Sequence, residues 1–328
     1  MFAEAIEAIL QDHCTPAAVR AIEAGGSPYH LWFAVADAGF LELLGSEDHG
    51  GAGLALAELF PVLTMLGRFG MPAPLAQSIA ARGLLGDTTE IPVGMITMAP
   101  SIRHAGDGKI VCQLAPYGAI ADYVLAEDNG ALCLLAAEEA QRSLTGVHGD
   151  LAATLTWAAG AQASRFPARA GSFAAFGAAL HAALLAGAMQ RVFDMTLQYA
   201  NDRSQFGKSI GKFQAIQHQI SVMAEHVAAA SIAAEAAFQG DGAAPSLLAG
   251  AIAKSRASEA AVLVASIAHA VHGAIGVTEE YDLQLYTRRL HEWRMVHGSE
   301  DYWNPLIGRT LLAGETATIA DFIRSAYA

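Results

Sequence analysis

Two long alanine-rich stretches constrain the fold of this chain more than any other feature. Ala, Leu, Met and Ile dominate from Phe173 to Phe238 and again from Ser246 to His272, and only Ser204–Gly211 interrupts the first stretch. These residue types have high helix propensity, and runs of this length predict helices of about five turns or more. Helices this apolar must bury most of their surface against one another. The last part of the chain is therefore predicted to form a helical bundle.

The residues before this bundle divide into two parts with different periodicity. From Leu31 to Phe40 and from Leu54 to Leu66, apolar residues recur at roughly helical spacing, and Gly45–Gly53 separates these segments as a tight loop. The middle of the chain instead carries short β-prone runs, and an Asn129-Gly130 pair between two of them is typical of a hairpin turn. These runs are Gly108–Leu114, Ala121–Glu127, Ala131–Ala137 and Leu151–Trp157.

The predicted fold is mostly α with a small β domain. We place an N-terminal helical domain at residues 1–90, a small β domain at 91–168 and a C-terminal helical bundle at 169–328. The content of 53% hydrophobic residues allows a large core.

Charge and cysteine usage exclude several classes of function. Acidic residues outnumber basic ones 32 to 19, and a net charge of −13 argues against nucleic acid as a partner. An anionic ligand would need a local basic pocket. Cys14, Cys112 and Cys133 are odd in number and show no metal-ligand spacing, which fits a reducing cytoplasm.

The remaining composition predicts neither export nor metal binding. The N-terminus is acidic where a signal peptide would be basic, and small or polar residues interrupt the apolar stretches, so we expect no membrane span and a cytoplasmic location. Several histidines lie close together in the last third of the chain, but no carboxylate completes a metal triad, so we expect no metal site. These histidines are His269, His272, His291 and His297.

Three sequence blocks, in the same order, carry a resemblance to a known family. The segment RSQFGKSIGKFQAIQHQISVMAEHV, Arg203 to Val227, resembles the signature of the acyl-CoA dehydrogenase flavoproteins, with an Arg, a Phe-Gly pair and a Phe-Gln pair at the family's separations. The blocks LWFAVADAGFLELLGSEDHGGAGLALAE and HGAIGVTEEYDLQLYTRRLHEWRMVHGSEDYWNPLIGRTLL also fit. The resemblance covers almost the whole chain and implies the family's fold: an N-terminal helical domain, a middle β domain and a C-terminal four-helix bundle.

The resemblance also implies a cofactor and the residues that would hold it. Family enzymes remove the α-proton of an acyl-CoA thioester with a carboxylate, while the β-hydrogen leaves as hydride to FAD. By resemblance, Arg203 would pair with the FAD diphosphate, and Phe206 and Gln214 would contact the FAD of a neighbouring subunit. The alternative for Arg203 is a surface salt bridge with Asp202 or Glu225.

Three further positions are weaker cofactor candidates. Gly273 lies where the family has a glycine-rich turn beside the flavin, but a glycine after a long helix also serves as its C-cap. In the final block, Ser299 takes the place of a Thr and Asp301 that of a Gln or Glu, and Ser299 is equally well suited to be a helix N-cap.

The family's catalytic base is missing. When the family's final block is aligned with this chain, His297 stands at the position of the usual Glu. The family's alternative site for this Glu lies near Ala178, and the stretch FAAFGAALHAALL around it contains no carboxylate. The same stretch lacks the Arg that commonly steadies the CoA moiety. A positioned base contributes roughly 10²- to 10⁴-fold in rate, so this loss is inconsistent with an ordinary enzyme of the family.

The β domain also lacks the polar residues with which the family contacts the flavin ring, and Ala115-Pro116-Tyr117 stands at their place. Contacts to a subunit's own flavin are thus lost, whereas those lent to a neighbour persist. This pattern resembles the short, incomplete subunits of steroid-degradation acyl-CoA dehydrogenases, which pair with a complete paralogue as α2β2 heterotetramers. The resemblance implies an acyl-CoA substrate, which could be a bulky, steroid-type thioester, and electron-transfer flavoprotein as acceptor.

Two other hypotheses stay open on the sequence. The chain could be a self-sufficient homo-oligomeric dehydrogenase with His297 as base, or a flavin-free pseudoenzyme that acts as a protein-binding scaffold.

Overall fold

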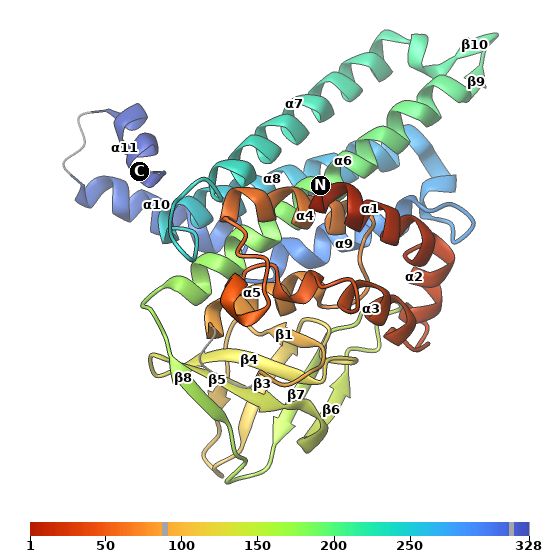
Figure 1. Ribbon diagram of the computed structural model, residues 1–328. Helices are drawn as coiled ribbons and strands as arrows, with labels where there is room; N and C mark the ends of the chain where they lie inside the picture. Colours follow the sequence, from red (N-terminus) through yellow and green to blue (C-terminus); the bar gives the residue numbers. More distant parts are fainter. Residues whose placement is uncertain (87–90, 315–317, 328) are drawn as a thin grey trace.

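The computed structural model describes residues 1–86, 91–314 and 318–327. Figure 1 shows two layers, with the helices of both ends of the chain packed together above a β domain formed by the middle. The first predicted domain boundary, at residue 90, lies outside the described residues. The predicted class, mostly helical with a small β domain, is confirmed.

The N-terminal part is helical, and its second helix has a well-formed N-cap. Thr15 precedes the second helix, its Oγ1 accepts a hydrogen bond from the Ala18 amide at 3.2 Å, and Pro16 occupies the first helical position. The predicted loop over Gly45–Gly53 is present and contains one short 3₁₀ turn. The elements are α1 (Phe2–His13), α2 (Pro16–Glu23), α3 (Tyr29–Ala36), η1 (Phe40–Glu42), η2 (Glu47–His49), α4 (Leu56–Arg68) and α5 (Leu75–Leu85).

The middle part forms two four-stranded sheets, with strand orders β1-β4-β5-β8 and β2-β3-β7-β6. The predicted hairpin joins β4 to β5, and its turn residues Asn129 and Gly130 have φ angles of 51° and 76°, as a type I′ turn requires. The elements are β1 (Ile96–Met98), β2 (Arg103–His104), β3 (Ile110–Ala115), β4 (Tyr123–Asp128), β5 (Ala131–Ala136), η3 (Ala137–Glu139), β6 (Ala140–Leu144), β7 (Ala153–Trp157) and β8 (Ser164–Pro167).

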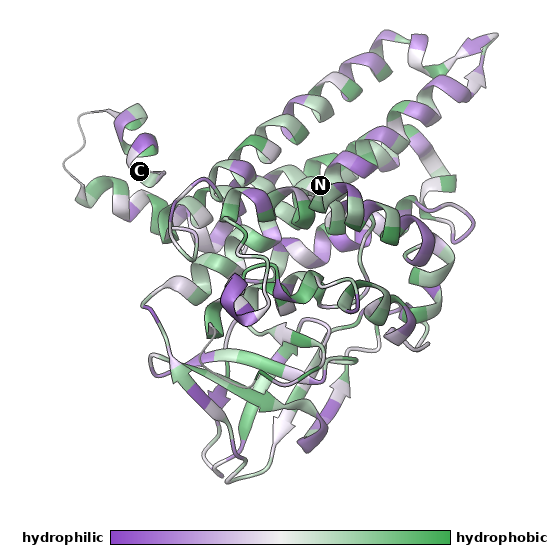
Figure 2. Ribbon diagram, viewed as in Figure 1, coloured by the Kyte–Doolittle hydropathy of each residue, from purple (hydrophilic) through white to green (hydrophobic). Residues whose placement is uncertain are grey.

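The last part is the predicted bundle, and the two alanine-rich stretches are its longest helices. The elements are α6 (Ser172–Asp202), β9 (Ser204–Gln205), β10 (Lys208–Ser209), η4 (Ile210–Lys212), α7 (Gln214–Ala236), α8 (Leu247–His272), η5 (Gly273–Val277), α9 (Leu283–Met295), α10 (Glu300–Ala313) and α11 (Ile319–Ala326). The β9–β10 hairpin joins α6 to α7 and projects beyond the rest of the molecule (Figure 1). Figure 2 shows apolar residues along α6 and α8 where these helices cross the middle of the protein.

Helix α6 lies in direct backbone contact with its neighbours because glycines stand at the crossings. A Cβ added to Gly187 of α6 would lie 1.9 Å from the Thr64 carbonyl oxygen of α4, and one added to Gly67 of α4 would lie 2.1 Å from the Leu184 carbonyl oxygen of α6. On the other side, a Cβ on Gly250 of α8 would lie 2.8 Å from the Ala175 carbonyl oxygen. Only hydrogen fits at these positions.

Among the residues that the structure describes, two helical segments are long and apolar enough to cross a membrane by length and composition, and the second joins α8 to η5. In Ser172–Asp202, 89% of the apolar window is buried inside the protein, and in Leu247–Val277 the share is 44%. The buried core helix of a bundle has the same composition. The expectation of no membrane span stays a prediction.

Two glycines, one at a helix crossing of α6 and one in open surroundings on α10, are predicted to respond in opposite ways to replacement by alanine. Gly187→Ala places a methyl group against the α4 backbone and should lower the free energy of unfolding by about 1–3 kcal/mol or more. Gly308→Ala, inside α10 with open space around the added Cβ, should raise it by about 0.5–1 kcal/mol. Urea unfolding followed by circular dichroism measures both, and equal effects would contradict this account of the crossings.

Candidate functional site

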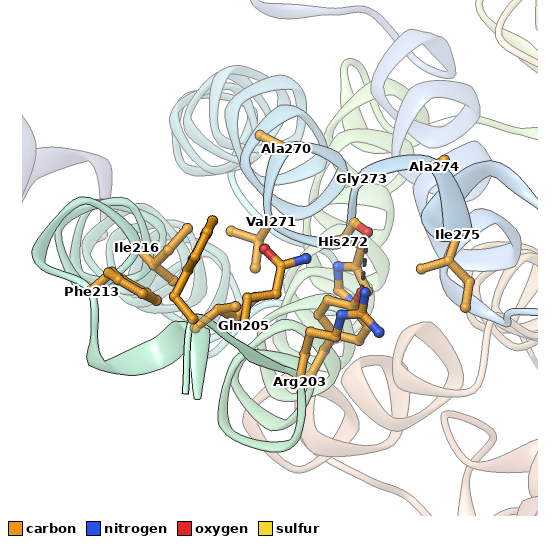
Figure 3. Close-up of a pocket in the computed structure, with 13 residues that line it drawn as sticks. Arg203, Gln205, Phe213, Ile216, Ala270, Val271, His272, Gly273, Ala274 and Ile275 are labelled. Atoms are coloured by element: carbon orange, nitrogen blue, oxygen red, sulfur yellow. Dashed lines mark hydrogen bonds between the residues drawn. The ribbon is translucent and has the colours of Figure 1, made fainter. Parts of the chain in front are cut away.

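A pocket of about 620 Å³ lies where α6 and α8 end beside the β9–β10 hairpin (Figure 3). The hairpin reverses the chain through Phe206 and Gly207, whose φ angles of 53° and 80° fit a type I′ turn. The amide of Ile210 then donates a hydrogen bond to the Arg203 carbonyl at 2.8 Å, which closes the hairpin onto the end of α6. The pocket is lined by Tyr199, Arg203, Gln205, Phe206, Ile210, Phe213, Ile216 and Ala270–Ile275.

Arg203 brings an uncompensated positive charge to this pocket. The side chain is exposed, and within the described part of the chain its guanidinium forms no ion pair, neither with Asp202 nor with Glu225. Lys208 and Lys212 lie close by in the sequence, and the Lys208 ammonium sits 4.2 Å from the Phe213 ring centroid. An acidic protein thus presents a local basic site, which an anionic ligand requires.

The aromatic residue at the tip of the hairpin is almost fully exposed. Phe206 has 92% of its surface open to solvent and meets the Phe213 ring edge-on at a centroid distance of 6.3 Å. Gln214, the first residue of α7, is exposed next to Phe213, but it does not line the pocket. An exposed ring on a projecting hairpin is the kind of group that a partner surface covers.

Gly273 is the residue at which α8 ends, and its backbone, without a side chain, forms part of the pocket wall. Its φ of 64° and ψ of −145° favour glycine, and no atom lies within 4 Å of a Cβ added there, so the space beside it is open. Gly273 is therefore a helix C-cap, as one sequence interpretation had it, and at the same time part of the pocket wall. Gly276 differs, because a Cβ there would lie 3.1 Å from both His272 and Leu283, which indicates packing.

His297 lies at the other end of α6, in the protein interior. It is 6% exposed, has a left-handed φ of 55°, and its Nε2 donates a hydrogen bond to the Met98 carbonyl at 3.2 Å. Its other nitrogen, Nδ1, faces Gly177, where an added Cβ would lie only 2.3 Å away. The rings of Phe173 and His181 pack at centroid distances of 5.8 and 5.2 Å. The lone pair that could accept a proton is thus packed against α6.

Burial also determines the protonation of this cluster. It lowers the pKa of His297 to about 4, with the Met98 hydrogen bond opposing the shift and the charge of Lys254 adding to it. Lys254 is fully buried and donates hydrogen bonds of 2.7 Å to the carbonyls of Arg294 and Gly298. These bonds fix the turn between α9 and α10 that carries His297.

Ser299 and Asp301 share this end of the molecule with His297. Ser299 is buried at the N-cap position of α10 but makes no side-chain capping hydrogen bond, and Asp301 is exposed in the first turn of the helix. Neither residue lines the pocket beside Arg203.

The predicted site residues therefore fall into two groups at opposite ends of α6. Twenty-six residues separate Gly177, against His297, from Arg203, which corresponds to about 39 Å of helix. The two groups of one chain therefore lie far apart.

Sequence reasoning missed several residues at both ends. His181 and Lys254 pack around His297, and Tyr199 and His272 line the pocket. Polar residues within apolar helices were the available signal for the first pair. No group of three or more potential metal ligands lies together in the residues described, and the expectation of no metal stays a prediction.

Comparison with known proteins identifies relatives over most of the chain. A family model described as the acyl-CoA dehydrogenase N-terminal domain matches residues 1–90, and one described as the C-terminal domain matches residues 168–312. Acyl-CoA dehydrogenase IpdE2 of Mycolicibacterium smegmatis is 33% identical over 88% of this chain and 90% of its own length. IpdE2 of Mycobacterium tuberculosis is 31% identical over 89% and 90%.

Solved structures show the same fold. The ChsE4-ChsE5 complex from Mycobacterium tuberculosis contains a chain that matches with a TM-score of 0.82 and 22% identity, covering 96% of this chain and 97% of that one. A chain of the Tcur3481-Tcur3483 steroid ACAD matches with a TM-score of 0.82 and 24% identity, covering 95% and 96%. At these identities the similarity concerns the fold alone.

The burial of His297 predicts a specific dependence of stability on pH. Its pKa is about 4 in the folded protein and 6.5 as an ordinary histidine, so as the pH falls from 6.5 to 4 the unfolded state binds the proton first and stability is lost. The loss amounts to about 3 kcal/mol. His297→Gln should remove it, so that the variant loses less stability than the native chain between pH 7 and pH 4.

Denaturant unfolding at a series of pH values measures this difference. His218→Gln, at an exposed position on α7, is the control for replacing a histidine by glutamine elsewhere in the chain. Parallel stability curves for the native chain and His297→Gln would show that His297 titrates normally in the folded protein.

Proposed function

The chain belongs to the acyl-CoA dehydrogenase family, and we propose that it acts as a half-site subunit of an FAD-dependent acyl-CoA dehydrogenase. In this role it lends FAD contacts to a complete, paralogous subunit in a dimer or tetramer and performs no proton abstraction itself. The observation that carries the proposal is the asymmetry of α6, which has an open basic pocket at one end and a closed histidine cluster at the other.

The residues of the open pocket fit one half of an FAD molecule. Arg203 offers an unpaired guanidinium, which binds diphosphate oxygens in a bidentate way. Gly273 lets the ligand approach the backbone closely, and the exposed Phe206 and Gln214 extend the contact surface towards a partner. When bound, FAD supplies the acceptor for the hydride that leaves the substrate.

The flavin-ring end of a family site does not fit this chain equally well. Tyr117 is buried, and its hydroxyl donates to the Met71 carbonyl at 3.2 Å, so it has no polar group free for a ring. In this proposal His297 does not replace the missing carboxylate, because its basic nitrogen is packed against Gly177 in the protein interior. Ser299 and Asp301 would be structural in this proposal.

The partner subunit would therefore supply the base, the flavin-ring contacts and the acyl-CoA site. The likeness in fold to the Tcur3481-Tcur3483 steroid ACAD supports a bulky CoA thioester, such as a steroid side chain, as the substrate. By analogy the electrons would pass to an electron-transfer flavoprotein. The net charge of −13 argues against nucleic acid as a further partner, and we place the complex in the cytoplasm, away from membranes.

The first test uses the chain purified alone. The half-site proposal predicts a colourless protein, without flavin absorbance and without bleaching when acyl-CoA thioesters are added anaerobically. A yellow protein that acyl-CoA bleaches would instead favour a homomeric enzyme with His297 as base.

The second test uses the chain co-purified with a complete paralogue. Arg203→Ala should weaken FAD binding by about 10- to 100-fold, as expected for the loss of a charged hydrogen-bonded contact. The control is Arg309→Ala, an exposed arginine of α10, which should bind FAD like the native complex. If Arg203→Ala left assembly, flavin content and activity unchanged, the chain would be a flavin-free scaffold.

A further inference from the structure

A second pocket, separate from the one beside Arg203, is formed by residues of α1, α4, α6 and α9 and of the turn into α2. Its volume is about 310 Å³. Arg191 in its wall precedes Tyr199, a residue of the first pocket, by eight residues, or about 12 Å of helix. Because α4 and α9 pack on α6, and α1 packs on α4, neighbouring helices hold the walls in place. The pocket is lined by Glu7, Gln11, Cys14, Thr15, Pro16, Arg68, Phe69, Arg191 and Tyr286.

Two arginines bring positive charge to this second pocket. Arg68, the last residue of α4, pairs with Asp194 at 2.8 Å, and Asp194 lies outside the lining. Arg191 forms no ion pair with a carboxylate of the described residues. Both side chains are partly buried, so water satisfies them only in part. Each guanidinium has five N–H donors, and one carboxylate cannot occupy those of both. Donors therefore remain for an oxyanion in the pocket.

Tyr286 of α9 adds a hydroxyl donor to the same wall. The residue is only 5% exposed, and Arg191 Cζ lies 5.6 Å from its ring centroid. Burial raises the pKa of Tyr286, against an opposing effect of the Arg191 charge, so the hydroxyl keeps its hydrogen at neutral pH. Among the described residues this hydroxyl donates to no acceptor. Its hydrogen is free to bind a ligand oxygen.

One carboxylate in the lining restricts which anion fits. Glu7 of α1 is the only acidic residue of this pocket, and Gln11, one turn later, donates to its Oε1 at 3.4 Å. The second oxygen, Oε2, has no partner among the described residues. An ionised carboxylate accepts hydrogen bonds but donates none. It therefore repels a fully ionised anion and suits one that still carries a hydrogen.

We propose that this second pocket binds inorganic phosphate in its hydrogen-bearing form. Arg191 and Arg68 donate to its ionised oxygens, and Tyr286 donates a further hydrogen bond. Glu7 accepts the hydrogen of the P–OH group. The site is independent of the flavin contacts around Arg203.

The same geometry disfavours two similar anions. Sulfate carries no hydrogen at neutral pH, and a phosphate monoester, whose second pKa is about 6, has mostly lost its last one. Either would face Glu7 without a hydrogen bond to offer. The net charge of −13 does not exclude an anion, because physiological salt screens charges beyond about 8 Å.

Isothermal titration calorimetry of the whole chain at pH 7 and constant ionic strength tests the site. The native chain should bind inorganic phosphate saturably, and sulfate and glycerol 3-phosphate roughly 10-fold more weakly or not at all. Arg191→Gln should weaken phosphate binding by about 10- to 100-fold, as expected for a lost charged hydrogen bond. The matched control is Arg309→Gln, at an exposed position of α10, which should bind like the native chain.

Glu7→Gln gives a signature that neither a general salt effect nor a loss of structure would produce. The amide has the size of the carboxylate but can donate, so this variant should bind sulfate more tightly than the native chain does, with an affinity close to that for phosphate. Glu7 is only partly buried, so this variant tests the site even if Arg191→Gln does not fold. The inference is overturned if the native chain binds no phosphate, if it binds sulfate equally well, or if a folded Arg191→Gln binds phosphate unchanged.

Discussion

The whole arrangement depends on α6 lying in backbone contact with helices on both sides. Gly187 and Gly67 let it touch α4, and Gly250 lets it touch α8, so one straight helix ties the N-terminal domain to the bundle. The same closeness recurs at Gly177, where the helix leaves space for the ring of His297 and no more. Close-packed helices tolerate little added volume, so α6 holds the pocket at its Arg203 end and the His297 cluster at its other end in fixed positions. An ion cluster adds to this connection, because buried Arg289 of α9 pairs with Glu23 at the end of α2 at 2.8 Å.

The two ends of α6 present opposite electrostatic surroundings. At the C-terminal end of α6, Arg203 is exposed and unpaired at the base of a projecting hairpin, in a protein whose net charge is −13. Near the N-terminal end of α6, His297 and His181 are buried. Burial lowers the pKa of both, so neither carries charge at neutral pH. The Arg203 end therefore offers a positive charge that suits an anionic ligand, whereas the His297 end offers neither a charge nor an accessible base. This contrast is the basis of the proposed division of labour between unlike subunits, with the chemistry in the partner and a binding surface in this chain.

Local patterns made much of the fold predictable, and long-range packing explains what was missed. The α6–α7 break at Ser204–Gly211 and the Asn129-Gly130 hairpin were predicted because Ala-rich helices and type I′ turns depend on neighbouring residues. Strands β6 and β8 were not predicted, because they are short and mostly exposed and their sequences show no alternation of apolar and polar residues. For the site, the family pattern pointed to Arg203 and His297. It could not reveal that Gly177 blocks the His297 lone pair or that Arg68 and Arg191 line one pocket, because contacts between residues far apart in the chain determine both.

The central claim is that this chain contributes half of a flavin site and holds none of its own. Native mass spectrometry of the complex with a complete paralogue tests it most directly, by counting FAD molecules against subunits. The account predicts one FAD for each pair of unlike subunits. One FAD for every subunit, this chain included, would contradict it, because the closed end of α6 would then have to hold a flavin ring.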